Sequence, residues 1–242
     1  MASKLICKNI KKFIKKKPIL NGINLKAEQG QIVALLGPNG SGKTTTFSIL
    51  CGLIKPDEGE LFLDKIDIKD LPMYKRSRLG IGYLPQEPSV FRGLTVEQNI
   101  CAVLEMRKLP KTKIEQTLNS LLKDLSLEQV RKSSAVIVSG GERRKLEIAR
   151  ALAADPKFIL LDEPFAGIDP LAIADMKDMI NILKSKGIGV IITDHNVRDT
   201  LPIADYAYLL FEGKVLVEGT PFEIIDNENA KRLYLGKSFS EK

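Results

Sequence analysis

The residues best placed to do chemistry form a glycine-rich run near the N-terminus. Gly37-Pro-Asn-Gly-Ser-Gly-Lys-Thr44 fits the phosphate-loop pattern Gly-x4-Gly-Lys-Ser/Thr. Its glycines let successive backbone N–H groups face phosphate oxygens, and a helix that begins there adds the positive end of its dipole. In this pattern Lys43 reaches the β- and γ-phosphates and the Thr44 hydroxyl binds Mg²⁺. The residues expected to contact the nucleotide are Gly37, Pro38, Asn39, Gly40, Ser41, Gly42, Lys43, Thr44 and Thr45.

A pair of carboxylates forms the second motif. The apolar run Phe158-Ile-Leu-Leu-Asp-Glu163 predicts a buried strand with Asp162 and Glu163 at its C-terminal end, where ligands of open α/β sheets bind. Asp162 suits a direct or second-sphere contact with Mg²⁺. Glu163 is placed to orient or deprotonate an attacking water. Adjacent carboxylates are common on protein surfaces, so this pair is informative only together with the phosphate loop.

The third motif is Val138-Ser-Gly-Gly-Glu142. Ser139 and Glu142 are spaced as a capping box, and such a helix N-terminus also receives a phosphate well. The Asn-Lys-x-Asp motif that reads guanine in GTPases is absent, because no asparagine is followed by lysine. His195, the only histidine, follows an apolar strand and lies 32 residues after Glu163.

The order of these motifs, with Gln86 between the first and the third, resembles the nucleotide-binding subunit of ABC transporters from residue 5 to about residue 225. The resemblance implies an ATPase that uses ATP and Mg²⁺. It assigns Glu163, His195 and Gln86 to catalysis. It makes Thr44, Gln86 and Asp162 the metal contacts.

The same resemblance implies a composite site in a homodimer. Ser139, Gly140, Gly141 and Glu142 would contact the ATP bound by the opposite subunit, and Asp169 would connect the two sites. The family also implies integral membrane permease subunits as partners and peripheral association at the cytoplasmic face of the inner membrane. No nucleic-acid partner is expected.

Within the family, runs such as Gly80–Gln86 and Arg232–Gly236 are most similar to the ATPases of lipopolysaccharide-export transporters of Gram-negative bacteria. The ATPase of a branched-chain amino-acid importer is the alternative, followed by soluble ABC proteins that act on ribosomes or DNA. Carried over from the export ATPases, Phe91 and Arg92 lie in the groove that receives a coupling helix of the permease. Ordinary core packing is the alternative for Phe91.

Two positions depart from the family pattern. Val138 begins the third motif where leucine is usual, a volume-conserving apolar change that should cost little. The residue that stacks on adenine is usually aromatic and lies about 23 residues before the phosphate loop, where this chain has Ile14 beside Phe13. Either the register shifts by one residue and Phe13 stacks, or an aliphatic contact replaces the ring. Both residues are therefore candidate ATP contacts.

An alternation of strands and helices must position these motifs. The sequence predicts short strands at Leu5–Ile10 and Pro18–Ile23, and a parallel strand buried on both faces at Gln31–Gly37. A helix follows from Gly42 to Gly52, and alternation within residues 59–68 predicts an antiparallel strand pair.

Helical spacing of apolar residues then dominates residues 95–155, and strand–helix alternation returns after them. The pattern predicts an α/β core interrupted by a helical insertion. The family resemblance implies that this is a P-loop NTPase (RecA-like) core with an antiparallel β subdomain and an inserted α-helical subdomain. We expect residues 1–242 to form one ABC nucleotide-binding domain, with the core and β subdomain in 1–94 and 156–242. The helical subdomain, 95–155, carries the Ser-Gly-Gly-Glu motif.

The composition is that of a globular protein, and the excess positive charge lies in one segment of the sequence. The 242 residues are 44% hydrophobic, and no apolar run is long enough to cross a bilayer. The formal net charge is +7, yet residues 1–26 hold eight lysines and no acidic residue. The other 29 basic residues are balanced by 30 acidic ones. A solvated lysine-rich hairpin, a contact with anionic lipid and, third, a contact with nucleic acid are the explanations for this segment.

Overall fold

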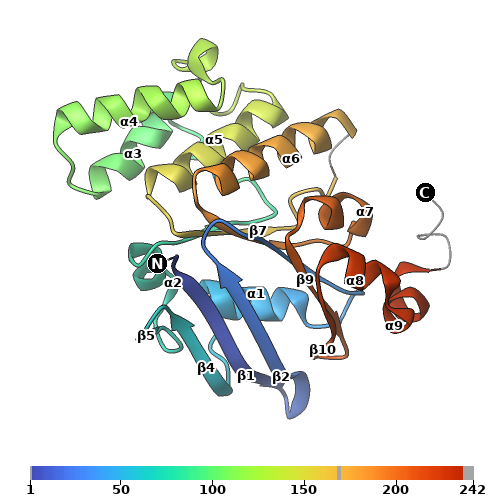
Figure 1. Cartoon of the computed structure of the whole chain (residues 1–242). Helices are drawn as coiled ribbons and strands as arrows, with labels where there is room; N and C mark the ends of the chain where they lie inside the picture. Colours follow the sequence, from blue (N-terminus) through green and yellow to red (C-terminus); the bar gives the residue numbers. More distant parts are fainter. Residues whose placement is uncertain (1, 168–169, 237–242) are drawn as a thin grey trace.

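A six-stranded sheet forms the centre of the computed structural model, which describes residues 2–167 and 170–236 (Figure 1). The five strands from β9 to β6 run parallel, and β10 pairs antiparallel with β9 at one edge. The strand order is β10 (Lys214–Gly219), β9 (Tyr206–Phe211), β3 (Ile32–Leu36), β8 (Gly189–Thr193), β7 (Phe158–Asp162) and β6 (Ile81–Leu84).

Both faces of this sheet are covered, as the continuous apolar strand predicts. On β3, Ile32 and Ala34 face one hydrophobic cluster, whereas Val33 and Leu35 face the other. All of these side chains are fully buried. The first cluster holds the helices drawn above the sheet in Figure 1, and the second holds helix α1 (Lys43–Cys51) and a smaller sheet. The parallel sheet is thus the middle layer of the molecule.

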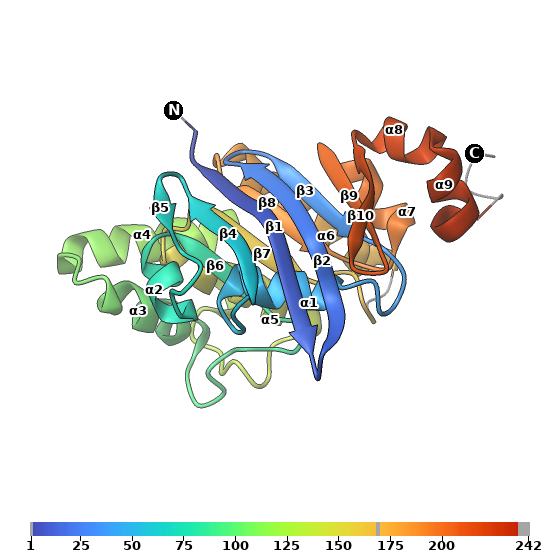
Figure 2. The same ribbon diagram turned by 90° about the horizontal axis from the view of Figure 1, so that it is seen from below.

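The smaller sheet is antiparallel, in the order β2-β1-β4-β5 (Figure 2). Its first hairpin corrects the expected strand lengths, since β1 spans Lys4–Ile14 and β2 spans Lys17–Glu28. Lysines interrupt the apolar alternation there, but backbone pairing continues past them across register shifts. The pair expected within residues 59–68 is β4 (Glu58–Leu63) and β5 (Ile66–Asp67). The N-terminal lysines therefore lie on an exposed β-hairpin.

Helices fill the segment where helical spacing was found. They are α3 (Val96–Met106), α4 (Lys111–Asp124), a short 3₁₀ helix (Glu128–Val130) and α5 (Gly140–Ala153). Their apolar stripes are buried in the same cluster as α6 (Pro170–Ser185), which packs on the sheet. The remaining helices are α2 (Met73–Arg78), α7 (Val197–Thr200), a 3₁₀ helix (Leu201–Ile203), α8 (Pro221–Asp226), α9 (Glu228–Ala230) and a π-helical turn (Lys231–Leu235).

None of the helices in residues 2–167 and 170–236 has the length and apolar character needed to cross a membrane.

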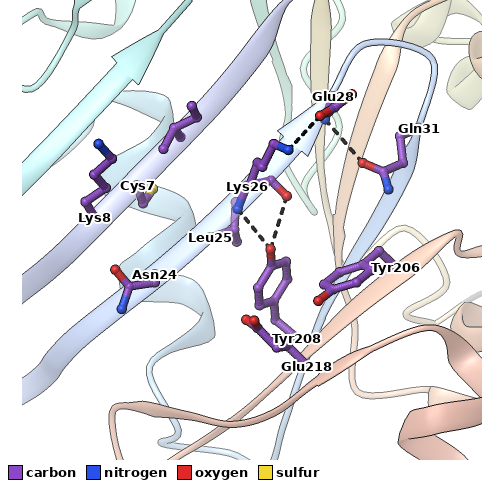
Figure 3. Close-up of a pocket in the computed structure, with 11 residues that line it drawn as sticks. Cys7, Lys8, Asn24, Leu25, Lys26, Glu28, Gln31, Tyr206, Tyr208 and Glu218 are labelled. Atoms are coloured by element: carbon purple, nitrogen blue, oxygen red, sulfur yellow. Dashed lines mark hydrogen bonds and ion pairs between the residues drawn. The ribbon is translucent and has the colours of Figure 1, made fainter.

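The seam between the two sheets contains a cavity of about 430 Å³ (Figure 3). From β9, the Tyr208 hydroxyl accepts a hydrogen bond from the Lys26 backbone N–H at 3.0 Å and donates one to the Lys26 carbonyl at 3.3 Å. The Gln31 side chain accepts a hydrogen bond from the Glu28 N–H. β2 is an edge strand, and these side chains occupy backbone groups that another chain could otherwise pair with. The side chains that line this cavity therefore protect the edge of the smaller sheet from pairing with another strand.

Candidate nucleotide site

The glycine-rich run connects the end of β3 to the start of α1, and two of its glycines are required by close contacts. A Cβ at Gly37 (φ 146°) would lie 2.3 Å from the Leu210 carbonyl oxygen. A Cβ at Gly42 (φ 104°) would lie 2.5 Å from the Leu20 side chain. The backbone therefore passes close to its neighbours and leaves its N–H groups, rather than side chains, to line the loop.

Lys43 is the buried cation of this loop. Its side chain is held by two carbonyl oxygens, with Nζ donating to Gly37 at 2.6 Å and to Pro38 at 3.0 Å. The residue is only 6% exposed. Burial lowers the pKa of the Lys43 ammonium, and the carboxylates of Glu163 and Asp194 partly offset that effect. The positive charge is thus oriented and surrounded by acceptors.

The rest of the loop fits a phosphate and a metal ion. Asn39, Gly40 and Thr44 are exposed, and Thr45 is half-buried. The hydroxyls of Ser41 and Thr46 are buried and have no hydrogen-bond partner among the described residues. Free buried hydroxyls, an open threonine and a helix N-terminus together form a donor set that matches an anionic ligand with its cation.

Asp162 lies at the C-terminal end of β7, and its two carboxylate oxygens are held separately. Oδ1 accepts a hydrogen bond from the Thr193 hydroxyl at 2.7 Å, and Oδ2 accepts one from the Tyr83 hydroxyl at 3.3 Å. Burial, followed by the Asp162 charge, raises the pKa of Tyr83, which keeps this phenol a donor. The Tyr83 ring also contacts Phe47 of α1 edge-on, with centroids 6.2 Å apart. Tyr83 lies on β6, the strand before Gln86. It therefore connects that strand to the carboxylate motif through Asp162 and to the helix after the phosphate loop through Phe47.

Glu163 and His195 come together because β7 and β8 are neighbours. Glu163 has a left-handed backbone (φ 46°), and its N–H donates to the Thr193 carbonyl at 2.8 Å. His195 Nδ1 lies 3.6 Å from Glu163 Oε2, and the imidazole is 57% exposed. The pair is open to solvent, and the Glu163 charge also acts on the buried Lys43.

The C-terminal segment reaches the same region, which the motif spacing does not predict. The Tyr234 hydroxyl lies 3.5 Å from the His195 carbonyl oxygen and also contacts the backbone of Gly37. Burial raises the pKa of Tyr234 to about 12. Only its place in the tail Arg232–Gly236, singled out by the resemblance, marks this residue in the sequence.

The Ser-Gly-Gly-Glu motif begins α5, and the capping box is present. Ser139 Oγ accepts a hydrogen bond from the Glu142 N–H at 3.2 Å, and the Ser139 N–H donates to Glu142 Oε2 at 2.9 Å. The Ser139 N–H and the Ser139 hydroxyl, which donates to Glu142 Oε2 at 2.8 Å, together lower the pKa of the Glu142 carboxyl. Gly140 and Gly141 line a cavity of about 210 Å³ together with Gln86 and Glu163.

The loop after Gln86 is tied to α5 and α3. The Ser89 N–H donates to Glu147 at 2.6 Å, and the Arg150 guanidinium lies 4.3 Å from the centre of the Phe91 ring. The Asn99 side chain bonds the Phe91 backbone N–H and carbonyl. Phe91 is 47% exposed, so ordinary core packing is the wrong interpretation for it. Arg92 beside it is also exposed.

The two candidate adenine contacts, Phe13 and Ile14, lie at the end of β1. Both side chains are exposed, at 41% and 51%. Asp169 lies outside the described residues.

The far end of α1 is capped by a buried arginine from α2. Arg76 is 1% exposed, and its guanidinium donates to carbonyl oxygens of Ile49, Leu50, Lys69 and Leu71. Burial lowers the pKa of Arg76, and the negative end of the α1 dipole favours the cation. The helix that begins at the glycine-rich loop is therefore fixed at its C-terminus as well.

Comparison with known proteins gives a consistent result. The family model described as "ABC transporter" matches residues 20–166. An uncharacterized ABC transporter ATP-binding protein of Rhizobium meliloti is 52% identical over 98% of this chain and 87% of its own length. The lipopolysaccharide export system ATP-binding protein LptB of Escherichia coli K12 is 49% identical over 97% of this chain and 98% of its own length.

Solved structures agree with these relatives. The ADP conformation of MJ1267, an ATP-binding cassette of an ABC transporter, has a TM-score of 0.85 at 27% identity, covering 97% of this chain and 99% of that one. The dimeric structure of the cassette MJ0796 bound to ADP and Pi has a TM-score of 0.76 at 26% identity, covering 90% and 98%. With its phosphate loop, paired carboxylates and histidine in one place, the chain belongs to the ATP-binding subunits of the ABC transporter family.

Proposed function

We propose that this ATPase subunit energises the export of lipopolysaccharide from the inner membrane through a membrane permease. The observation that carries the substrate is the 49% identity, over nearly the whole chain, to a relative named for lipopolysaccharide export. A second such relative, from Haemophilus influenzae, is 48% identical over 97% of the chain. The site geometry supports the hydrolytic part of this proposal independently of the transported substrate.

In the proposed reaction, the chain binds ATP by its phosphate loop and activates a water beside the γ-phosphate. Lys43 exchanges its carbonyl acceptors for β- and γ-phosphate oxygens. Glu163 orients or deprotonates the water, and His195 contacts the γ-phosphate and holds Glu163 in place, which their 3.6 Å separation allows. Phosphoryl transfer depends mainly on positioning and charge stabilisation, and these residues supply both.

A metal site would form between three of the motifs. Thr44, Gln86 and Asp162 would hold Mg²⁺, which neutralises charge on the β- and γ-phosphate oxygens. The fixed orientation of the Asp162 carboxylate supports this assignment, because both of its oxygens already have donors that set its plane.

The proposed active form is a homodimer with two composite sites. The chain has one phosphate loop and one Ser-Gly-Gly-Glu motif, so two copies supply two of each. Residues Ser139–Glu142 of one copy would contact the ATP of the other, and Asp169 would connect the sites. An exposed α5 N-terminus supports this arrangement.

The proposed permease contact is centred on Phe91 and Arg92. Phe91 presents about half of its surface to solvent while its backbone is fixed by Asn99 and its ring is covered on one face by Arg150. A rigid exposed aromatic is the kind of anchor that a short helix of a partner recognises. The subunit would then associate peripherally with the cytoplasmic face of the inner membrane.

Purification from detergent-solubilised membranes tests the transport assignment. We expect the chain to bring down a permease pair, and the complex in lipid vesicles to release lipopolysaccharide only with ATP. Phe91→Ala should abolish co-purification and leave the ATPase activity of the isolated subunit within about threefold. Capture of an amino-acid permease, of ribosomes or of DNA in place of that pair would contradict the proposal.

A further inference from the structure

A buried carboxylate lies between the two loops that carry Glu163 and His195. Asp194 follows β8, and its side chain is completely buried. Its Oδ2 accepts a hydrogen bond from the Phe165 N–H at 3.1 Å, and its Oδ1 accepts one from the Asn196 N–H at 2.7 Å. Phe165 belongs to the turn after Glu163, and Asn196 follows His195. One side chain therefore connects the backbones of both loops.

Both oxygens of the buried Asp194 carboxylate have backbone donors. Burial raises the pKa of Asp194, and the N–H groups of Asn196 and Phe165 oppose that rise. The Asp194 charge in turn favours the charged form of the buried Lys43 ammonium. A buried carboxylate is costly unless it is hydrogen-bonded, and here that condition is met at each oxygen. An asparagine would keep the shape but offer one accepting oxygen, so its amide N–H₂ would face a backbone N–H.

The position of Asp194 also bears on the imidazole itself. Asp194 Oδ1 lies 3.7 Å from His195 Nδ1, almost the same distance as Glu163 Oε2. The imidazole is thus placed between a buried carboxylate and a half-buried one. Moving the backbone of either loop would change the spacing between Glu163 and His195.

We propose that Asp194 is a positioning residue for hydrolysis, which fixes the spacing of Glu163 and His195 without contacting ATP. This inference rests on the proposed hydrolytic role of that pair. The described hydrogen bonds of Asp194 go to the loops after β7 and β8, and none goes to the phosphate loop, so we expect its loss to slow the chemical step more than it weakens nucleotide binding. A displacement of about 1 Å at a reacting group can cost about 100-fold in rate.

Steady-state kinetics of Asp194→Asn provide the first test, with Asp205→Asn as the matched control. Asp205 also accepts a backbone hydrogen bond, from the Ile32 N–H at 2.8 Å, and it pairs with Lys184. It directly precedes β9 and lies beside the start of β3, whereas the phosphate loop follows the other end of β3. We expect Asp194→Asn to lower kcat about 100-fold with KM within about threefold, and Asp205→Asn to leave both within about threefold. An unchanged kcat for Asp194→Asn would overturn the proposal.

A second measurement does not depend on hydrolysis. His195 is the only histidine, so the imidazole NMR signals of a chain without a histidine tag report on this loop alone. They should move in Asp194→Asn and stay in place in Asp205→Asn. In the unsubstituted chain, the amide protons of Phe165 and Asn196 should exchange slowly with solvent. Fast exchange at both would overturn the proposal even if the variant does not fold.

These readouts separate two kinds of failure. A chain that does not hydrolyse ATP, with protected Phe165 and Asn196 amides, would remove the proposed function and leave the connection through Asp194 standing. Full activity of Asp194→Asn with unmoved His195 signals would do the reverse.

Discussion

At the scale of single residues, the site consists of motif side chains and the partners that orient them. Lys43 is recognisable from the phosphate-loop pattern, Asp162 and Glu163 from their strand together with that loop, and His195 from the family resemblance. Their orientation depends on residues outside the motifs: Tyr83 and Thr193 hold the two oxygens of Asp162. Partners of this kind orient a carboxylate that binds a metal, so if Asp162 holds Mg²⁺ as proposed, their removal should weaken Mg²⁺ binding.

Tyr83→Phe tests this at one atom. The substitution removes the hydroxyl that donates to Asp162 Oδ2 and keeps the ring that contacts Phe47. We expect the Mg²⁺ concentration needed for half-maximal ATPase activity to rise about tenfold. Tyr74→Phe, on the exposed face of α2, should leave the Mg²⁺ dependence unchanged. Equal Mg²⁺ dependence in both variants would show that the Tyr83 hydroxyl has no part in placing Asp162.

Much of this site can be predicted from sequence because its motifs are local. The phosphate loop needs only eight consecutive residues, and the strand–carboxylate run needs six. Tyr83, Tyr234 and Arg76 escape prediction for the opposite reason, since each acts on a residue 27 or more positions away. The residues that surround a tyrosine or an arginine in the sequence do not indicate which distant group its side chain will contact.

At the scale of elements, α1 is held at both ends. Its N-terminus carries the glycine loop, and its C-terminal carbonyl groups are bonded by the guanidinium of Arg76. Gly52, which ends the helix in the left-handed conformation (φ 82°), leaves room for that group: a Cβ there would lie 2.8 Å from Arg76 Nε. The chain runs from α2 through β6 to Gln86, so the contact of Arg76 with α1 also connects α1 to the segment that leads to Gln86.

Arg76→Met should therefore destabilise the fold. The substitution leaves the buried Leu50 carbonyl oxygen without its donor and removes one of two donors from the Ile49 carbonyl oxygen, which also accepts from the Gly52 N–H; together these losses cost about 3 kcal/mol. Urea unfolding followed by circular dichroism measures the change. Arg78→Met, on the exposed side of the same helix, is the control and should stay within about 0.5 kcal/mol of the parent. Coincident unfolding curves for the two variants would rule out Arg76 as a significant cap.

The hairpin shows where sequence reasoning underestimates an element. Its apolar alternation ends at Ile10, and the expected strand ends there too. The structure continues β1 to Ile14, because pairing with β2 and β4 satisfies the backbone whatever the side chains are. Lys11 and Lys12 then form ion pairs with Glu58 and Asp57. Strand ends on an exposed hairpin are decided by partners that a one-dimensional pattern does not contain.

At the scale of the whole molecule, the third motif lies on the surface. The N-terminus of α5 is exposed, whereas Ser41, Gly42 and Lys43 of the phosphate loop are buried. The dimeric cassette among the solved relatives has the same fold over 90% of the chain. In the homodimer proposed above, two copies of this 26.8 kDa chain would bring every motif into use.

Glu163→Gln tests assembly directly. Without the carboxylate that activates water, bound ATP should persist and keep two copies closed on it. Light scattering should give about twice the monomer mass with ATP and Mg²⁺, and the monomer mass without nucleotide. Phosphate release should fall about 100-fold or more. A monomeric mass with ATP bound, or rapid phosphate release, would contradict the roles given to Glu163 and to the second copy.

The buried Lys43 has a consequence for how affinity is distributed between folding and binding. Its ammonium is already stripped of water and oriented by the Gly37 and Pro38 carbonyl groups before any ligand arrives. Dehydration of this cation therefore belongs to the folding free energy of the chain, and an arriving phosphate has only to displace two neutral oxygens. The dehydration of Lys43 therefore lowers the stability of the fold, and in return ATP binding does not have to include that cost.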